Sequence, residues 1–167
     1  SYIRLMIDDL YSARILGLAA NLPHAGRLAR PDGTGERVAR LCGSRATVDV
    51  CLDDQGRVAA FAQDIKACAL GQAAAGVIGE AVIGAKVDEI TTAAAALSAM
   101  LKDGGEGPVG RFEGLRVLEA VADYPQRHAS TQVAMGALVD AVDMALAARE
   151  TAATDDKTER TRRAGAA

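Results

Sequence analysis

The middle of the chain contains two short segments in which apolar residues alternate with polar ones. This period of two is typical of β-strands with one buried face. The segments cover residues 46–52 and 58–65, and Asp53-Asp54-Gln55-Gly56 between them has the composition of a tight turn. We therefore predict a β-hairpin, with residues 38–41 as a candidate third strand. A hairpin alone is marginally stable in water, so helices should cover one face of the sheet.

Apolar residues recur at helical spacing on both sides of this hairpin. The predicted helices cover residues 8–20, 69–83, 86–101, 115–121 and 130–149, and residues 23–36 are predicted to form a loop. This order predicts an α+β fold in which a small three-stranded antiparallel sheet packs against a layer of helices. Residues 1–150 form the predicted domain. Residues 151–167 are polar, mixed in charge and without periodicity, and we predict a disordered tail there.

Composition excludes several classes of function. The net charge is -3 and only 3% of residues are aromatic, which disfavours a nucleic-acid surface built on phosphate contacts and base stacking. No run of about 18 apolar residues is present, so no membrane span is expected. Three cysteines at irregular spacing are typical of free thiols in a reducing compartment. We therefore expect a cytoplasmic protein.

Two of the cysteines should meet at one end of the sheet. Cys42 precedes the first strand of the hairpin, and Cys68 follows the second strand and begins a helix. An antiparallel hairpin places these two positions side by side. A helix N-terminus and the nearby Lys66 both favour a thiolate, so Cys68 is the strongest candidate for a sulfur acceptor or thiolate ligand. Cys51 lies on a strand away from this end and is interpreted as a small core residue.

Four segments of the chain resemble a known family. They are LYSARILGLAANLPHAGRL, LCGSRATVDV, KACALGQAAAGVIGEAVIG and VLEAVADYPQRHASTQVAMGAL, in that order. Together they resemble the NifU N-terminal, IscU and SufU type of iron–sulfur cluster assembly scaffold. The family pattern is Cys-Gly-Asp before a strand, a cysteine followed by small residues at a helix start, and a third cysteine after Pro-x-Arg. The resemblance covers about residues 9–147 and implies an IscU-like fold.

The chain departs from the family pattern at two ligand positions. Ser44 stands where the family has the aspartate of Cys-Gly-Asp, and Ser130 stands where it has the third cysteine. A hydroxyl is a much poorer ligand for iron or zinc than a thiolate. The resemblance thus implies Cys42 and Cys68 as ligands, with His128 and Ser130 as candidates and Ser44 as a weaker one. Ser130 is equally suited to cap the last helix.

The resemblance implies a scaffold or carrier, rather than an enzyme, that binds iron or a [2Fe–2S] cluster through the paired cysteines. A cysteine desulfurase would supply sulfur to Cys68 or Cys42, and recipient apo-proteins would take the cluster. Two thiolates do not fill the four protein positions of such a cluster, so a homodimer or an exogenous thiol would complete it. One alternative is a zinc-dependent, SufU-like sulfur acceptor that assists a desulfurase. Another is a metal-free interaction module that docks to a larger complex.

Overall fold

Three antiparallel strands form the sheet of this protein, whose computed structural model describes residues 10–166. The strands are β1 (Gly33–Ala39), β2 (Ser44–Leu52) and β3 (Val58–Lys66), in the order β1-β2-β3. The helices are α2 (Ala13–Ala20), α3 (Ala69–Ala81), α4 (Val87–Asp103) and α5 (His128–Ala166), with 3₁₀ helices η1 (Gly110–Asp123) and η2 (Pro125–Arg127). This architecture confirms the predicted α+β fold. The predicted first helix, 8–20, begins outside the described residues.

The alternation in the hairpin sets which face of the sheet is buried. Ala46, Val48 and Val50 point to the helical layer and are fully buried. The β2–β3 register pairs Arg45 with Lys66 and shifts between Cys51 and Leu52, where the ladder is irregular. The predicted hairpin is therefore present with its turn at residues 53–57.

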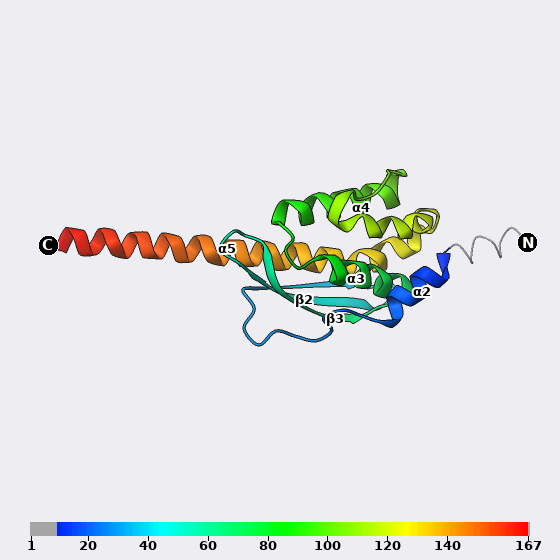
Figure 1. Cartoon of the computed structure of the whole chain (residues 1–167), viewed down its shortest axis with the longest axis horizontal. Coiled ribbons are helices and arrows are strands. Elements are labelled where there is room, and N and C mark those ends of the chain that lie inside the picture. The colour runs from blue at the N-terminus through cyan, green and yellow to red at the C-terminus, as the bar shows by residue number, and fades with distance from the viewer. Residues whose placement is uncertain (1–9, 167) are drawn as a thin grey trace, which may run out of the picture.

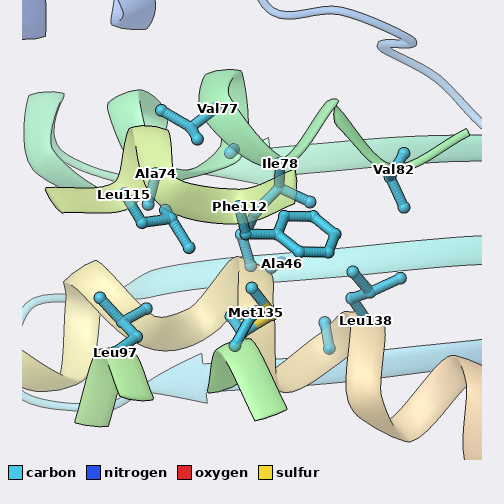
Figure 2. Close-up of a cluster of buried hydrophobic side chains, with 14 of the residues drawn as sticks. Ala46, Ala74, Val77, Ile78, Val82, Leu97, Phe112, Leu115, Met135 and Leu138 are labelled. Atoms are coloured by element: carbon cyan, nitrogen blue, oxygen red, sulfur yellow. The ribbon is translucent and has the colours of Figure 1, made fainter. Parts of the chain in front are cut away.

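Helices cover one face of the sheet in two layers. Helices α3 and α5 pack directly on the strands, whereas α4 packs on α5 and on η1, and η1 packs on α3 (Figure 1). Figure 2 shows the core between these layers, where Phe112 of η1 lies close to Ile78 of α3 and Met135 of α5. The core therefore joins both helical layers to the sheet.

The long helix α5 crosses strand β1 at very short range. A Cβ atom added to Gly35 would lie 2.8 Å from the backbone N of Ala141 and closer still to the carbonyl O of Ala137. Gly33 meets the next turn of α5 in the same way. This explains why β1 begins at Gly33, whereas we predicted a loop over residues 23–36 and a third strand only at 38–41. Glycine has a low propensity for strands, but at these two positions it allows the close contact between helix and strand.

The second face of the sheet is covered by the loop that precedes β1, and a buried aspartate holds that loop. Asp49 is fully buried; its carboxylate accepts hydrogen bonds from Arg27 Nε at 2.7 Å, Leu28 N at 3.0 Å and Thr34 Oγ1 at 2.6 Å. Burial by itself would raise the pKa of Asp49, but the hydrogen bonds from Arg27, Thr34 and Leu28 outweigh it and lower the pKa. The ionised carboxylate thus connects this loop to strand β2.

Helix α5 continues to Ala166 and extends away from the domain (Figure 1). This differs from the disordered tail that we predicted for residues 151–167. Every side chain from 151 to 166 is exposed, and ion pairs one helical turn apart join Asp156 to Arg160 and Glu159 to Arg163. Such pairs support a solvated helix without an apolar stripe. The sequence of this segment lacks apolar periodicity because the helix does not pack on the domain, and not because the segment is unfolded.

The first part of α5 is apolar and long. By length and composition alone, the helical stretch Pro125–Ala166 could cross a bilayer, with a mean hydropathy of 1.3 over its most apolar window. Half of that window is buried inside the fold, where α5 packs on β1 and β2. This burial is typical of a core helix.

Candidate functional site

Cys42 lies in the short turn that joins β1 to β2. Ala39 pairs with Ser44 across this turn, and the N–H of Gly43 donates to the carbonyl O of Ala39 at 2.9 Å. Gly43 has a φ of 72°, a left-handed conformation that glycine adopts without strain. The turn holds Cys42 outward, and its side chain is exposed.

Cys68 occupies the N-cap position of α3, two residues after β3 ends at Lys66. Its backbone is extended, with φ of -65° and ψ of 172°, and no side-chain hydrogen bond caps the helix. The thiol is half-buried. The predicted helix start at Cys68 is therefore confirmed, and α3 follows over Ala69–Ala81.

The structure brings Cys42 and Cys68 to one open pocket of about 400 Å³. The pocket is formed by the turn after β1, the end of β3 and the first turn of α3. Its lining residues are Cys42, Gly43, Ser44, Lys66, Ala67, Cys68 and Gln72. Gln72 was not predicted as a site residue, although its position four residues after Cys68, one helical turn along α3, could have indicated it. The hairpin thus places the two cysteines at the same pocket, as expected.

Ser130 approaches the same thiols from the first turn of α5. Its Oγ lies 3.7 Å from Cys68 Sγ and donates to the carbonyl O of Arg127 at 3.1 Å, and the residue is buried. Gly71 makes this approach possible, because a Cβ atom there would lie 2.8 Å from the carbonyl O of Ser130. The small residues after Cys68 therefore let α5 begin beside the thiol.

Ser44 contacts the other thiol. Its Oγ lies 3.3 Å from Cys42 Sγ, and Ser44 is buried at the start of β2. The hydroxyl of Ser44, followed by its backbone N–H and with a smaller effect from Ser130, lowers the pKa of the Cys42 thiol. A thiolate is the nucleophilic and metal-binding form of cysteine. Cys42 is thus an exposed thiol whose surroundings favour ionisation.

His128 is not among the residues that line the pocket. Its Nε2 lies 3.1 Å from the carbonyl O of Val121 and 3.2 Å from that of Ala122, so the ring donates to the end of η1. Among residues 10–166, no three His, Cys, Asp or Glu side chains are close enough together to hold a metal ion. The donors gathered at the pocket are two thiols and two hydroxyls.

Cys51 lies near the far end of β2, away from this pocket. Its Sγ donates to the carbonyl O of Arg30 at 3.4 Å, and the residue is partly exposed. Cys51 is therefore a natural control for experiments on the other two thiols.

The chain is similar to a known protein family and to several solved structures. The model of the family described as "NifU-like N terminal domain" matches residues 10–131, a range that includes Cys42, Cys68 and Ser130. No curated protein sequence matches. The structure is similar to the crystal structure of a nitrogen-fixing NifU-like protein (N-terminal) from Brucella abortus, with 44% identity and a TM-score of 0.81, over 84% of this chain and 96% of that one.

Two further solved structures share the fold. A hypothetical protein is 25% identical with a TM-score of 0.71, over 81% of this chain and 98% of that one. A putative iron–sulfur cluster assembly scaffold protein for the SUF system from Fervidobacterium islandicum AW-1 is 20% identical with a TM-score of 0.73, over the same shares of the two chains. With the family match over residues 10–131 and the shared architecture, the chain belongs to the NifU-like N-terminal domain family.

Proposed function

We propose that this protein is a scaffold or carrier in iron–sulfur cluster assembly and that Cys42 and Cys68 are its sulfur ligands to iron. The observation that carries the proposal is the convergence of these two thiols, from separate elements, on one open pocket. Family membership and the likeness to the Fervidobacterium scaffold protein agree with it. The cluster is cargo here, received and passed on.

The chemistry of the pocket suits temporary binding. Thiolates bind iron strongly, and the hydroxyls of Ser44 and Ser130 beside them are weak ligands. A cluster held by two strong ligands at an exposed site is accessible to a recipient apo-protein. His128 could join only after its Nε2 leaves the carbonyl groups of Val121 and Ala122. The donor set thus favours transfer over permanent storage.

Sulfur would reach the pocket from a cysteine desulfurase that carries a persulfide. A thiolate of this chain would attack the terminal sulfur of that persulfide, forming a new S–S bond and releasing the desulfurase cysteine as a thiolate. No outside oxidant is needed for this exchange. The sequence left Cys68 or Cys42 as the acceptor, with Cys68 the stronger candidate; the exposure and the lowered pKa of Cys42 support Cys42.

Anaerobic reconstitution with iron and sulfide tests the scaffold function. The wild-type protein should gain visible absorbance, and Cys42→Ser and Cys68→Ser should each lose most of it. Cys51→Ser should retain it, because that thiol lies away from the pocket. A protein that stays colourless under all reconstitution conditions would rule out the scaffold function.

A second candidate function is a zinc-dependent sulfur acceptor that assists a desulfurase. The lowered pKa of the exposed Cys42 favours it, since a thiolate is both a zinc ligand and a sulfur nucleophile. Metal analysis of the purified protein distinguishes the two functions. Stoichiometric zinc that is lost in the Cys42→Ser, Cys68→Ser double variant supports this candidate, and zinc that persists without both thiols contradicts it.

A further inference from the structure

We propose that the thiol pocket binds an anionic low-molecular-weight thiol, whose sulfur completes the ligand set around the cluster. This inference rests on the proposed scaffold function. It assigns a small-molecule site to the pocket lined by Cys42, Cys68 and Lys66, and it names the chemical class of the ligand.

The pocket has fewer sulfur ligands than a cluster needs. An ordinary [2Fe–2S] cluster takes four protein ligands, whereas the pocket offers two thiols. Ser44 and Ser130 are buried beside these thiols, and the hydroxyl of Ser130 already donates to the carbonyl O of Arg127. In the described part of the chain, no third acidic, histidine or cysteine side chain completes a metal-binding group. Within residues 10–166, the two thiols therefore leave positions on such a cluster for a ligand that binds from outside.

The pocket is large enough to hold a small molecule. The pocket has a volume of about 400 Å³ and is open to the surface, and ligand sites for small molecules are typically about 300–1,000 Å³. Gly43 forms one side of the opening and contributes no side chain. A peptide-sized thiol can therefore approach the two cysteines directly.

Cationic side chains lie at and around the pocket. Lys66 lines the pocket and Arg45 pairs with it across β2 and β3, so the two cationic side chains are neighbours on one face of the sheet. Arg45 is 3.8 Å from Glu36, and none of the ion pairs in residues 10–166 involves Lys66. Arg40 is exposed in the adjoining turn. These cations favour a thiol that carries carboxylates.

The same charges disfavour a second copy of the chain as the source of the missing ligands. If two copies met with these pockets facing each other, Arg40, Arg45 and Lys66 of each would add positive charge on both sides of the interface, and like charges across an interface oppose association. A small anionic thiol avoids this repulsion. On binding, it would lose its S–H proton to solvent and its sulfur would replace a weakly held water or hydroxide on iron, a ligand exchange in which no electron is transferred.

Native mass spectrometry after reconstitution with iron and sulfide tests this inference. The full chain is reconstituted with glutathione, which is anionic, with 2-mercaptoethanol, which is neutral, or without added thiol. With glutathione, the expected species is one chain with one cluster and two glutathione molecules. Lys66→Gln should raise the half-saturating glutathione concentration about two- to fivefold, the effect of one exposed charge pair, and this change should exceed the change for 2-mercaptoethanol, which has no carboxylate for Lys66 to attract. Lys102→Gln, an exposed lysine on α4, is the matched control and should behave as wild type.

Three results would overturn the inference while leaving the scaffold function intact. One is a cluster bridging two chains without bound thiol, which would assign the missing ligands to a second copy. Another is a single chain that holds the cluster equally well without added thiol. The third is an unchanged glutathione requirement in Lys66→Gln. Failure to form any cluster in all three conditions would instead remove the scaffold function, and the inference with it.

Discussion

At the scale of single residues, Ser130 places a hydroxyl beside the thiol of Cys68. Its Oγ is 3.7 Å from Cys68 Sγ. Ser130→Cys should therefore add a thiolate to the pocket and raise zinc affinity about tenfold or more, equivalent to about 1.4 kcal/mol. Competition with a chromophoric zinc chelator measures this change. Ser130→Ala is the control and should show no gain, and an equal affinity of Ser130→Cys and wild type would mean that residue 130 does not reach the bound metal.

Asp49 is a buried residue whose charge should stabilise the fold. Asp49→Asn removes a buried acceptor that serves Arg27, Leu28 and Thr34, and we expect a loss of about 1–3 kcal/mol in the free energy of unfolding at pH 7. Urea denaturation measures it. Asp54→Asn, in the exposed hairpin turn, should change stability by less than about 0.5 kcal/mol.

The lowered pKa of Asp49 also gives this loss a pH dependence. The stability from a carboxylate with a lowered folded-state pKa is fully present above the pKa of the unfolded chain, near 3.8, and is lost as the pH falls through the lower folded-state value. The difference between wild type and Asp49→Asn should therefore be constant near neutral pH and shrink below about pH 3.8. A difference that stayed constant down to pH 2 would mean that ionisation of Asp49 does not matter.

Single residues also show what sequence reasoning can predict about the site. The approach of Cys42 to Cys68 follows from antiparallel pairing alone, and the structure places both at one pocket. The direction of the His128 ring has no local signal, because it depends on the carbonyl groups at the end of η1. Gly71 is similar: its importance appears only when α5 is present beside it.

At the scale of secondary-structure elements, the contact between β1 and α5 depends on glycine. Gly35→Ala should push the new methyl group into the backbone of α5 near Ala137 and Ala141, and overpacking of this kind costs about 1–3 kcal/mol or more. Thermal unfolding monitored by circular dichroism measures the cost. Gly17→Ala in α2 is the matched control: nothing lies within 4 Å of its added Cβ, so it should be neutral or stabilising by up to about 1 kcal/mol. Equal stability of the two variants would show that α5 can move away from β1 without cost.

The same contact explains which elements the sequence could predict. Strands β2 and β3 were predicted because their apolar residues alternate with the buried face, and α3 and α4 because their apolar residues follow the helical period. The start of β1 was missed because its two glycines are required by a helix about 100 residues later in the chain, which is information that no local window contains.

At the scale of the whole molecule, the structure is a packed domain from which the end of α5 extends into solvent (Figure 1). One helix has two roles along its length: its first half is core and its second half is polar and exposed on every side. Arg149 marks the change, since its guanidinium still donates to the carbonyl groups of Leu52 and Asp53. The domain should therefore keep its stability when the chain is cut after residue 150.

Removal of residues 151–167 tests this division of the molecule. The melting temperature should change by only about 1–2 °C, because no core side chain is lost. The maximum dimension from small-angle X-ray scattering should fall by about 24 Å, the length of 16 residues at about 1.5 Å per residue, and the helical circular dichroism should fall in proportion. In the full chain, Glu159→Lys removes the partner of Arg162 and Arg163 and adds a like charge, so it should reduce helicity without changing the melting temperature. A fall of many degrees on truncation would instead mean that this part of α5 supports the domain.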